Sequence, residues 1–342
     1  MRRIMAGLGL ALGLIGFQAF AVQAQAEELN IYSSRHYPSD ELLFGKFKEE
    51  TGISVNLIQG KAAELVERMK LEGANSPADI FITTDAANLW RAQAAGLFQP
   101  VTSPALEKSV PAQFHEPTGL WYAFATRARV LVYNKDRVRP EELSTYEALA
   151  APEWKGRVLS RSSNNEYVQS MVAALIAHLG EEKTEEWAKG VVDNFARQPK
   201  GGDTDQIRAV AVGEADVAIV NHYYFARIVA SDKPEDQDVV EKVGIFFPDQ
   251  DSFGTHTNVS GAGVAAHAPN RDAAIKFLEY LASPEAQAIF AEANNEFPIL
   301  EGVAPSSVVQ GFGPFKRDTL PINELGLNNA AAVQLLDRAG WR

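Results

Sequence analysis

The feature that most constrains the fold of this chain is a regular alternation of strand-like and helix-like segments. Short apolar or alternating runs, which are typical of strands, occur at residues 29–33, 53–58 and 78–83. Helical patterns follow each of them, at residues 39–50, 62–72 and 86–95. Strands that alternate with helices predict a largely parallel, doubly wound sheet. Ligands of such sheets bind at the loops beyond the carboxyl ends of the strands.

A β-rich stretch at residues 119–134 is longer than the five or six residues of a usual strand. We interpret it as a crossover into a second lobe, because 342 residues are too many for one comfortable core. The second lobe is expected to contain strands at residues 157–160, 215–221 and 243–247, and helices at 167–179 and 183–194. A return crossover is expected near residues 244–263, followed by a β-like run at 262–266 and helices at 272–282 and 284–294.

These crossovers divide the chain. We predict a signal peptide at residues 1–26, a first lobe from residues 27–125 plus about 250–300, a second lobe from 126–249, and a C-terminal helical tail from 301–342. The expected fold is α/β with two lobes, each a mostly parallel sheet flanked by helices, joined by crossover hinge strands. Two or more hinge strands suit a cleft that closes over a ligand.

The N-terminus has the pattern of a secretory signal peptide. Met1-Arg2-Arg3 precedes an apolar run, and Ala24-Gln25-Ala26 then supplies a small-x-small cleavage site. A membrane anchor is the weaker interpretation, because glycines interrupt the apolar run and its downstream flank is acidic. No later stretch reaches the ~18 to 20 apolar residues that a spanning helix needs. We therefore predict cleavage after Ala26 and export to the periplasm.

Charge and cysteine content narrow the classes of partner. The formal net charge is −12, and loss of two arginines with the signal peptide makes it −14. Such a chain is not expected to bind nucleic acid or an anionic membrane surface. It contains no cysteine, so any metal must be bound by oxygen or imidazole ligands.

Tyrosines occur at three of the loops where a ligand is expected. Tyr37 follows the first strand, Tyr167 begins a helix after a polar loop, and Tyr223 and Tyr224 are adjacent at a strand end. Neighbours on a strand point to opposite faces, so the adjacent pair can reach one ion only if the backbone turns there. Converging phenolate oxygens would bind a hard, highly charged cation. The alternative is ordinary packing with the hydroxyl at a polar edge.

The residues around these tyrosines resemble those of a known family. The stretches are residues 31–37 (IYSSRHY), 160–167 (SRSSNNEY) and 221–227 (NHYYFAR). With them, nearly the whole exported chain is similar to the periplasmic ferric-iron-binding proteins of ABC importers, of the tyrosine-rich Fut and Fbp type. The resemblance implies a type II periplasmic-binding-protein fold, capture of Fe(III) between the lobes, and delivery to an inner-membrane ABC permease.

The resemblance also implies roles for single residues. Tyr37, Tyr167, Tyr223 and Tyr224 would be the iron ligands, and His36 is a fifth ligand in some members of the family. A neutral His36 imidazole could instead hydrogen-bond a phenolate or face solvent, so this point stays open.

Charge balance favours ferric iron at such a site. Deprotonating a phenol with a pKa near 10 costs roughly 4 kcal/mol at pH 7, or about 16 kcal/mol for four. Ferric iron is hard and prefers anionic oxygen, so it can offset this cost. Four phenolates leave Fe(III) with a net charge of −1, which one guanidinium can neutralise, whereas Fe(II) would keep −2. Arg127 matches the position of an arginine beside the ligands in the family, and Arg35 and Arg161 are further candidates.

Three alternatives stay open. Carbonate, citrate or water could complete the coordination of iron. The same fold could carry another cargo, such as a polyamine, thiamine or an oxyanion. An exported hydrolase belongs to a different class, but the chain has no GxSxG, HExxH or Cys-His signature. We therefore expect a monomeric binding protein rather than an enzyme, with iron and a permease as its partners.

Overall fold

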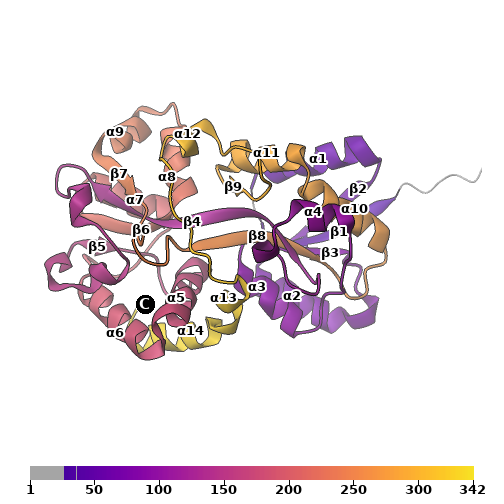
Figure 1. Ribbon diagram of the computed structural model, residues 1–342, viewed down its shortest axis with the longest axis horizontal. Helices are drawn as coiled ribbons and strands as arrows, with labels where there is room; N and C mark the ends of the chain where they lie inside the picture. The colour runs from indigo at the N-terminus through magenta and orange to yellow at the C-terminus, as the bar shows by residue number, and fades with distance from the viewer. Residues whose placement is uncertain (1–26, 36) are drawn as a thin grey trace, which may run out of the picture.

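The protein has two α/β lobes that lie side by side and are joined by long strands (Figure 1). The computed structural model describes residues 27–35 and 37–342. The predicted signal peptide and the candidate ligand His36 lie outside these described residues. Within the described ranges, no helix combines the length and the apolar character needed to cross a bilayer.

The first lobe is built from the alternating segments that open the chain. Its strands are β1 (Glu28–Ser33), β2 (Ser54–Gln59) and β3 (Ile80–Thr83), and its helices are α1 (Ser39–Thr51), α2 (Ala62–Glu72), α3 (Ala86–Ala94) and α4 (Pro104–Ser109). β1 pairs in parallel with both β2 and β3, so the predicted alternation is confirmed. α1 ends at Gly52, whose φ of 74° is the left-handed conformation that favours glycine at a helix C-terminus.

Two strands connect the lobes. β4 (Tyr122–Asn134) pairs antiparallel with β8 (Thr257–Val264) as far as Ala128, and from Arg129 onward it pairs with strands of the second lobe. β8 also pairs antiparallel with β3 and so carries the chain back to the first lobe. The predicted crossovers are therefore present (Figure 1).

One boundary was wrong: the return strand begins at Thr257, not at residue 262. Its first half is polar and small, so it lacks the apolar alternation by which strands are recognised. Buried hydrogen bonds explain this composition, because Asn258 donates to the Asp85 carboxylate over 2.6 Å and Ser260 accepts from Arg127 at 3.0 Å. Further along the strand, at Gly261, an added Cβ would lie 2.7 Å from the Tyr122 carbonyl oxygen, so the close approach of β4 leaves no room for a side chain.

The second lobe surrounds the other half of β4. Its strands are β5 (Val158–Leu159), β6 (Val217–Asn221) and β7 (Val243–Phe246), and its helices are α5 (Glu166–Leu179), α6 (Glu181–Asp193), α7 (Asp203–Ala211), α8 (His222–Val229) and α9 (Pro234–Lys242). β5 pairs in parallel with β6, while β6 and β7 run antiparallel to β4. Short 3₁₀ turns occupy Gly73–Asn75, Ala112–Phe114, Pro140–Glu142, Glu147–Ala150 and Pro152–Trp154.

The C-terminal third returns to the first lobe and then crosses again. Its elements are α10 (Arg271–Leu281), α11 (Pro284–Asn294), β9 (Phe297–Pro298), α12 (Ser307–Gln310), α13 (Asn323–Leu327) and α14 (Asn329–Arg338). α14 and Trp341 pack into the core of the second lobe, and α13 contacts both α3 and α5. The predicted division of residues 27–342 into lobes and tail stays a prediction.

Candidate functional site

Four tyrosines lie together where strands end and helices begin. Tyr37 lies between β1 and α1, Tyr167 is in the first turn of α5, and Tyr223 and Tyr224 are in the first turn of α8. The exposed fraction is 5% for Tyr37, 5% for Tyr167 and 0% for Tyr223, while Tyr224 is half-buried. The fold thus brings together all four tyrosines that the sequence singled out.

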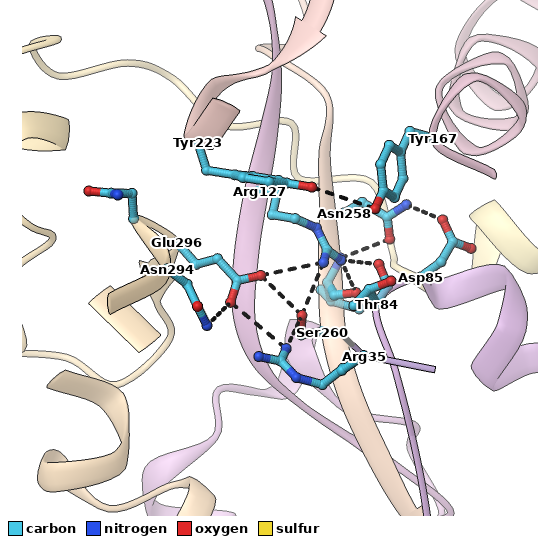
Figure 2. Close-up of polar contacts among 12 residues, drawn as sticks. Arg35, Thr84, Asp85, Arg127, Tyr167, Tyr223, Asn258, Ser260, Asn294 and Glu296 are labelled. Atoms are coloured by element: carbon cyan, nitrogen blue, oxygen red, sulfur yellow. Dashed lines mark hydrogen bonds and ion pairs between the residues drawn. The ribbon is translucent and has the colours of Figure 1, made fainter. Parts of the chain in front are cut away.

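Ring and hydroxyl contacts link the four side chains, which we call the tyrosine cluster. The Tyr223 hydroxyl donates to the Tyr167 hydroxyl over 3.5 Å (Figure 2). The rings of Tyr37 and Tyr223 meet edge to face with centroids 6.3 Å apart, and those of Tyr223 and Tyr224 are 4.3 Å apart. The backbone turn required at the adjacent pair is present, because β6 ends at Asn221 and helix α8 begins at the next residue.

Helix starts favour negative charge at this place. Tyr167, Tyr223 and Tyr224 lie in the first turns of α5 and α8, and Tyr37 lies two residues before α1. The N-terminal end of a helix carries a partial positive charge, which stabilises nearby anions. At α5 the Asn165 side chain caps the helix by accepting the Tyr167 backbone N–H over 3.2 Å. The helix starts therefore place partial positive charge near the backbone of these residues.

His222, which adjoins the tyrosines, has a structural role. Its Nδ1 accepts the Ala128 backbone N–H over 3.2 Å, and its Nε2 lies 2.9 Å from the Asn295 carbonyl oxygen. Burial lowers the pKa of His222 to about 3, so the imidazole is neutral. Both ring nitrogens contact backbone groups, so the imidazole links β4 to the Asn295 segment.

Arg127 lies on β4 at the floor of the tyrosine cluster (Figure 2). It is 1% exposed, donates to the carbonyls of Thr84 and Val259, and pairs with Glu296 at 3.4 Å. Burial lowers the pKa of Arg127, but the charges of Tyr37 and Glu296 outweigh burial and raise the pKa above its ordinary value. A permanent positive charge therefore lies beside the tyrosines.

Arg35 and Arg161 lie against single tyrosine rings. The Arg35 Cζ is 4.7 Å from the Tyr37 ring centroid, and its guanidinium pairs with Asp40 at 2.9 Å. The Arg161 Cζ is 5.6 Å from the Tyr167 ring centroid. Both distances are those of cation–π contacts, so all three predicted arginines adjoin the cluster.

Sequence reasoning missed two charged residues at the site. Arg227 places its Cζ 5.3 Å from the Tyr37 ring centroid, 5.0 Å from that of Tyr223 and 5.7 Å from that of Tyr224. Arg227 lies four residues after Tyr223 and three after Tyr224, a spacing that predicts the same face of the helix. The other residue is Glu296, which is fully buried. No local pattern signals its role, because its partners are far away in the sequence.

The surroundings keep three of the tyrosines protonated in the free protein. Burial raises the pKa of Tyr167 and Tyr223 well above 10, and the other phenolates of the cluster add to the rise. Burial and the Glu296 charge raise the pKa of Tyr37, against the opposing charges of Arg127 and Arg35. A ligand that needs phenolates must therefore displace protons.

A cavity of about 640 Å³ opens next to the cluster, between the lobes. Its first-lobe lining is Ser34, Arg35, Gln59, Gly60, Lys61, Ala62, Ala63 and Arg91, and its second-lobe lining is Asn164, Glu166 and Gln169. In the described part of the chain, no group of three or more His, Cys, Asp or Glu side chains is placed to hold a metal.

One family and three known proteins are similar to this chain over much of its length. Residues 75–310 match the family described as bacterial extracellular solute-binding protein. Iron uptake protein A1 of Synechocystis sp. is 54% identical over 318 residues, which cover 93% of this chain and 88% of that protein. The Fe(3+)-binding periplasmic protein of Serratia marcescens is 29% identical over 94% of each chain.

A solved structure extends the comparison to three dimensions. The Trichodesmium protein (IdiA, FutA), in complex with iron and citrate ligands, is 54% identical and superimposes with a TM-score of 0.88. The match covers 92% of this chain and 100% of that one. The predicted two-lobed periplasmic-binding-protein fold is confirmed.

Proposed function

Because this chain belongs to the bacterial extracellular solute-binding proteins, among their iron uptake and ferric-iron-binding members, we propose that it captures Fe(III) between its lobes for delivery to an ABC permease. The observation that carries the proposal is the meeting of four tyrosines from both lobes, three of them almost fully buried. Phenolates are not what a polyamine, thiamine or oxyanion site would use, so the donor set favours iron over those cargoes.

In this proposal Tyr37, Tyr167, Tyr223 and Tyr224 are the ligands of iron. Arg127 supplies the positive charge that balances the net −1 of a four-phenolate Fe(III) complex. Arg35 and Arg161 add further positive charge through their cation–π contacts with Tyr37 and Tyr167. His36, which lies outside the described residues, is proposed as a fifth ligand.

An exogenous anion such as carbonate or citrate completes the coordination. Supporting this, the 640 Å³ cavity beside the cluster includes the cationic side chains Arg35, Lys61 and Arg91 in its lining. The Trichodesmium relative was solved with both iron and citrate.

We propose the following setting for this function. The protein acts in the periplasm after removal of residues 1–26, as a monomer, with iron and an inner-membrane permease as partners and no nucleic acid. It is a carrier without catalytic activity, as its relatives are binding proteins of iron uptake. Its first lobe comprises residues 27–125 and about 250–300, its second lobe 126–249, and its tail 301–342.

The test is a visible spectrum with elemental analysis of the purified protein. Fe(III)-loaded protein is expected to show a tyrosinate-to-iron charge-transfer band, and the double variant Tyr223→Phe/Tyr224→Phe is expected to lose it. Tyr280→Phe, in the core of the first lobe, is the matched control and should keep the band. A colourless protein that takes up no iron would refute the proposal.

A further inference from the structure

A buried carboxylate bridges two of the arginines at the floor of the tyrosine cluster. Glu296 lies in the short connection between α11 and β9 and is 0% exposed. Its Oε1 lies 3.4 Å from the Arg127 guanidinium and accepts from the Ser260 hydroxyl at 3.1 Å. Its Oε2 lies 3.8 Å from the Arg35 guanidinium. Figure 2 shows Glu296 next to both guanidiniums, so one negative charge is shared by two positive ones.

The connection that carries Glu296 is held from both lobes. On one side, the Asn294 side chain accepts from the Ser39 hydroxyl at the start of α1 and donates to Glu296 Oε2 over 3.3 Å. On the other side, the Asn295 carbonyl contacts His222 Nε2, directly before Tyr223. The Glu296 carboxylate is therefore fixed relative to the ligand segments of both lobes.

This carboxylate reduces the positive charge that the tyrosines experience. Arg35 and Arg127 bring two positive charges to the proposed site, whose four phenolates would leave Fe(III) at −1 and Fe(II) at −2. Glu296 offsets part of this positive charge, together with Asp40, which lies 2.9 Å from Arg35. An additional negative charge destabilises the more negative complex more strongly. A buried charge has a large effect, since water screens it little.

We infer that Glu296 is a positioning residue that sets the reduction potential of the bound iron, by holding a negative charge against Arg35 and Arg127. The inference rests on the proposed function, because it concerns iron in the tyrosine cluster. With Glu296 in place, the site favours Fe(III) over Fe(II) more than the same tyrosines and arginines would without this carboxylate.

The experiment compares Glu296→Gln, which keeps the shape and loses the charge, with Glu296→Asp, which keeps the charge and shortens the reach. The reduction potential of each iron-loaded variant is measured by following the tyrosinate band during a reductive titration. Glu296→Gln is expected to raise the potential, so that Fe(II) gains roughly tenfold in affinity relative to Fe(III). The reduction potential of Glu296→Asp should stay close to that of the unmodified protein. Glu116→Gln, which removes a buried carboxylate in the turn that precedes β4, is the control and should leave the potential unchanged.

A second variant keeps the inference testable where the first does not fold. If Glu296→Gln does not fold, Asp40→Asn removes the other carboxylate that pairs with Arg35 and must raise the potential in the same direction.

Three outcomes are decisive. An unchanged or lowered potential in Glu296→Gln, or in Asp40→Asn where that variant takes its place, overturns the inference. A larger shift in Glu296→Asp than in Glu296→Gln also overturns it, because reach rather than charge would then be the cause. If the unmodified protein shows no tyrosinate band, the proposed function itself fails. A normal band with an unshifted potential leaves that function intact and rejects the role of Glu296 alone.

Discussion

The two lobes contribute unequally to the tyrosine cluster. The second lobe provides Tyr167, Tyr223 and Tyr224 from the first turns of two helices, and two of their hydroxyls are already 3.5 Å apart. The first lobe provides Tyr37 from a loop, and this residue meets the others only across the cleft. The difference suggests an order of events. In the proposed mechanism, the second lobe would offer a nearly complete binding surface, and the first lobe would add Tyr37 when the cleft closes.

The largest expected effect is the release of iron at acid pH. The dependence of iron affinity on pH reports how many tyrosines bind the iron. Burial raises the pKa values of Tyr37, Tyr167 and Tyr223, so binding must expel their protons, and affinity must fall as the pH falls. Each displaced proton contributes about a tenfold loss per pH unit. The logarithm of iron affinity, plotted against pH between 7 and 5, should therefore have a slope equal to the number of protons displaced. Tyr37→Phe should lower this slope by one. Affinity independent of pH would contradict phenolate ligation.

The next effect is loss of a second-lobe ligand. Tyr223→Phe should lower the affinity for Fe(III) by more than about 100-fold. Mutations of residues that only contact metal ligands already lower metal affinity by about 10–100-fold. Competition with a chelator of known affinity measures this loss. If Tyr37→Phe weakened binding as much as Tyr223→Phe, the proposed order of binding would be wrong.

A smaller effect is expected at the first lobe. Tyr37→Phe should cost roughly 10–100-fold in Fe(III) affinity, because the three second-lobe tyrosines remain. The charge-transfer band should persist, and small-angle X-ray scattering of the iron-loaded variant should show a more open molecule than the unmodified protein. A compact, fully closed variant would show that Tyr37 is not needed for closure.

The smallest effect concerns the stability of the iron-free protein at alkaline pH. The pKa values of Tyr167 and Tyr223 lie well above 10 in the folded state, so the unfolded chain loses those protons first as the pH rises. Stability should therefore fall above pH 10, and Tyr223→Phe should reduce this fall. Denaturant unfolding at pH 8 and pH 10.5 measures the change in the free energy of unfolding. An equal fall in the unmodified protein and in Tyr223→Phe would contradict a raised pKa of Tyr223.

Local signals in the sequence were sufficient for most of the fold. Apolar periodicity and helix-stop residues predicted the elements from β1 to α3, and the length of residues 119–134 predicted the crossover that became β4. The start of β8 was missed because its polar residues, such as Asn258 and Ser260, make buried hydrogen bonds and do not follow an alternating apolar pattern. Helices α7 and α9 were not predicted either.

The candidate site was predictable to the extent that its residues lie in recognisable motifs. Tyr37, Tyr167 and the adjacent pair were found from their places in loops and at helix starts and from the resemblance of their motifs to ferric-iron-binding proteins, and the structure brings them together. Arg227 could have been predicted, because it lies four residues after Tyr223 and three after Tyr224, on the same face of the helix. Glu296 was not predictable, because its bridge to Arg35 joins residues at opposite ends of the chain.

By itself, the sequence determined the alternating elements, the two crossovers, the absence of thiolate ligands and the choice of tyrosine at strand ends. These properties are local or compositional, so periodicity and residue type are enough to read them. Tertiary structure alone decided that the four phenols meet, that His222 serves the backbone, and that Glu296 lies between two arginines. Those outcomes depend on how β4 and β8 set one lobe against the other, and distances across lobes are not contained in any local pattern.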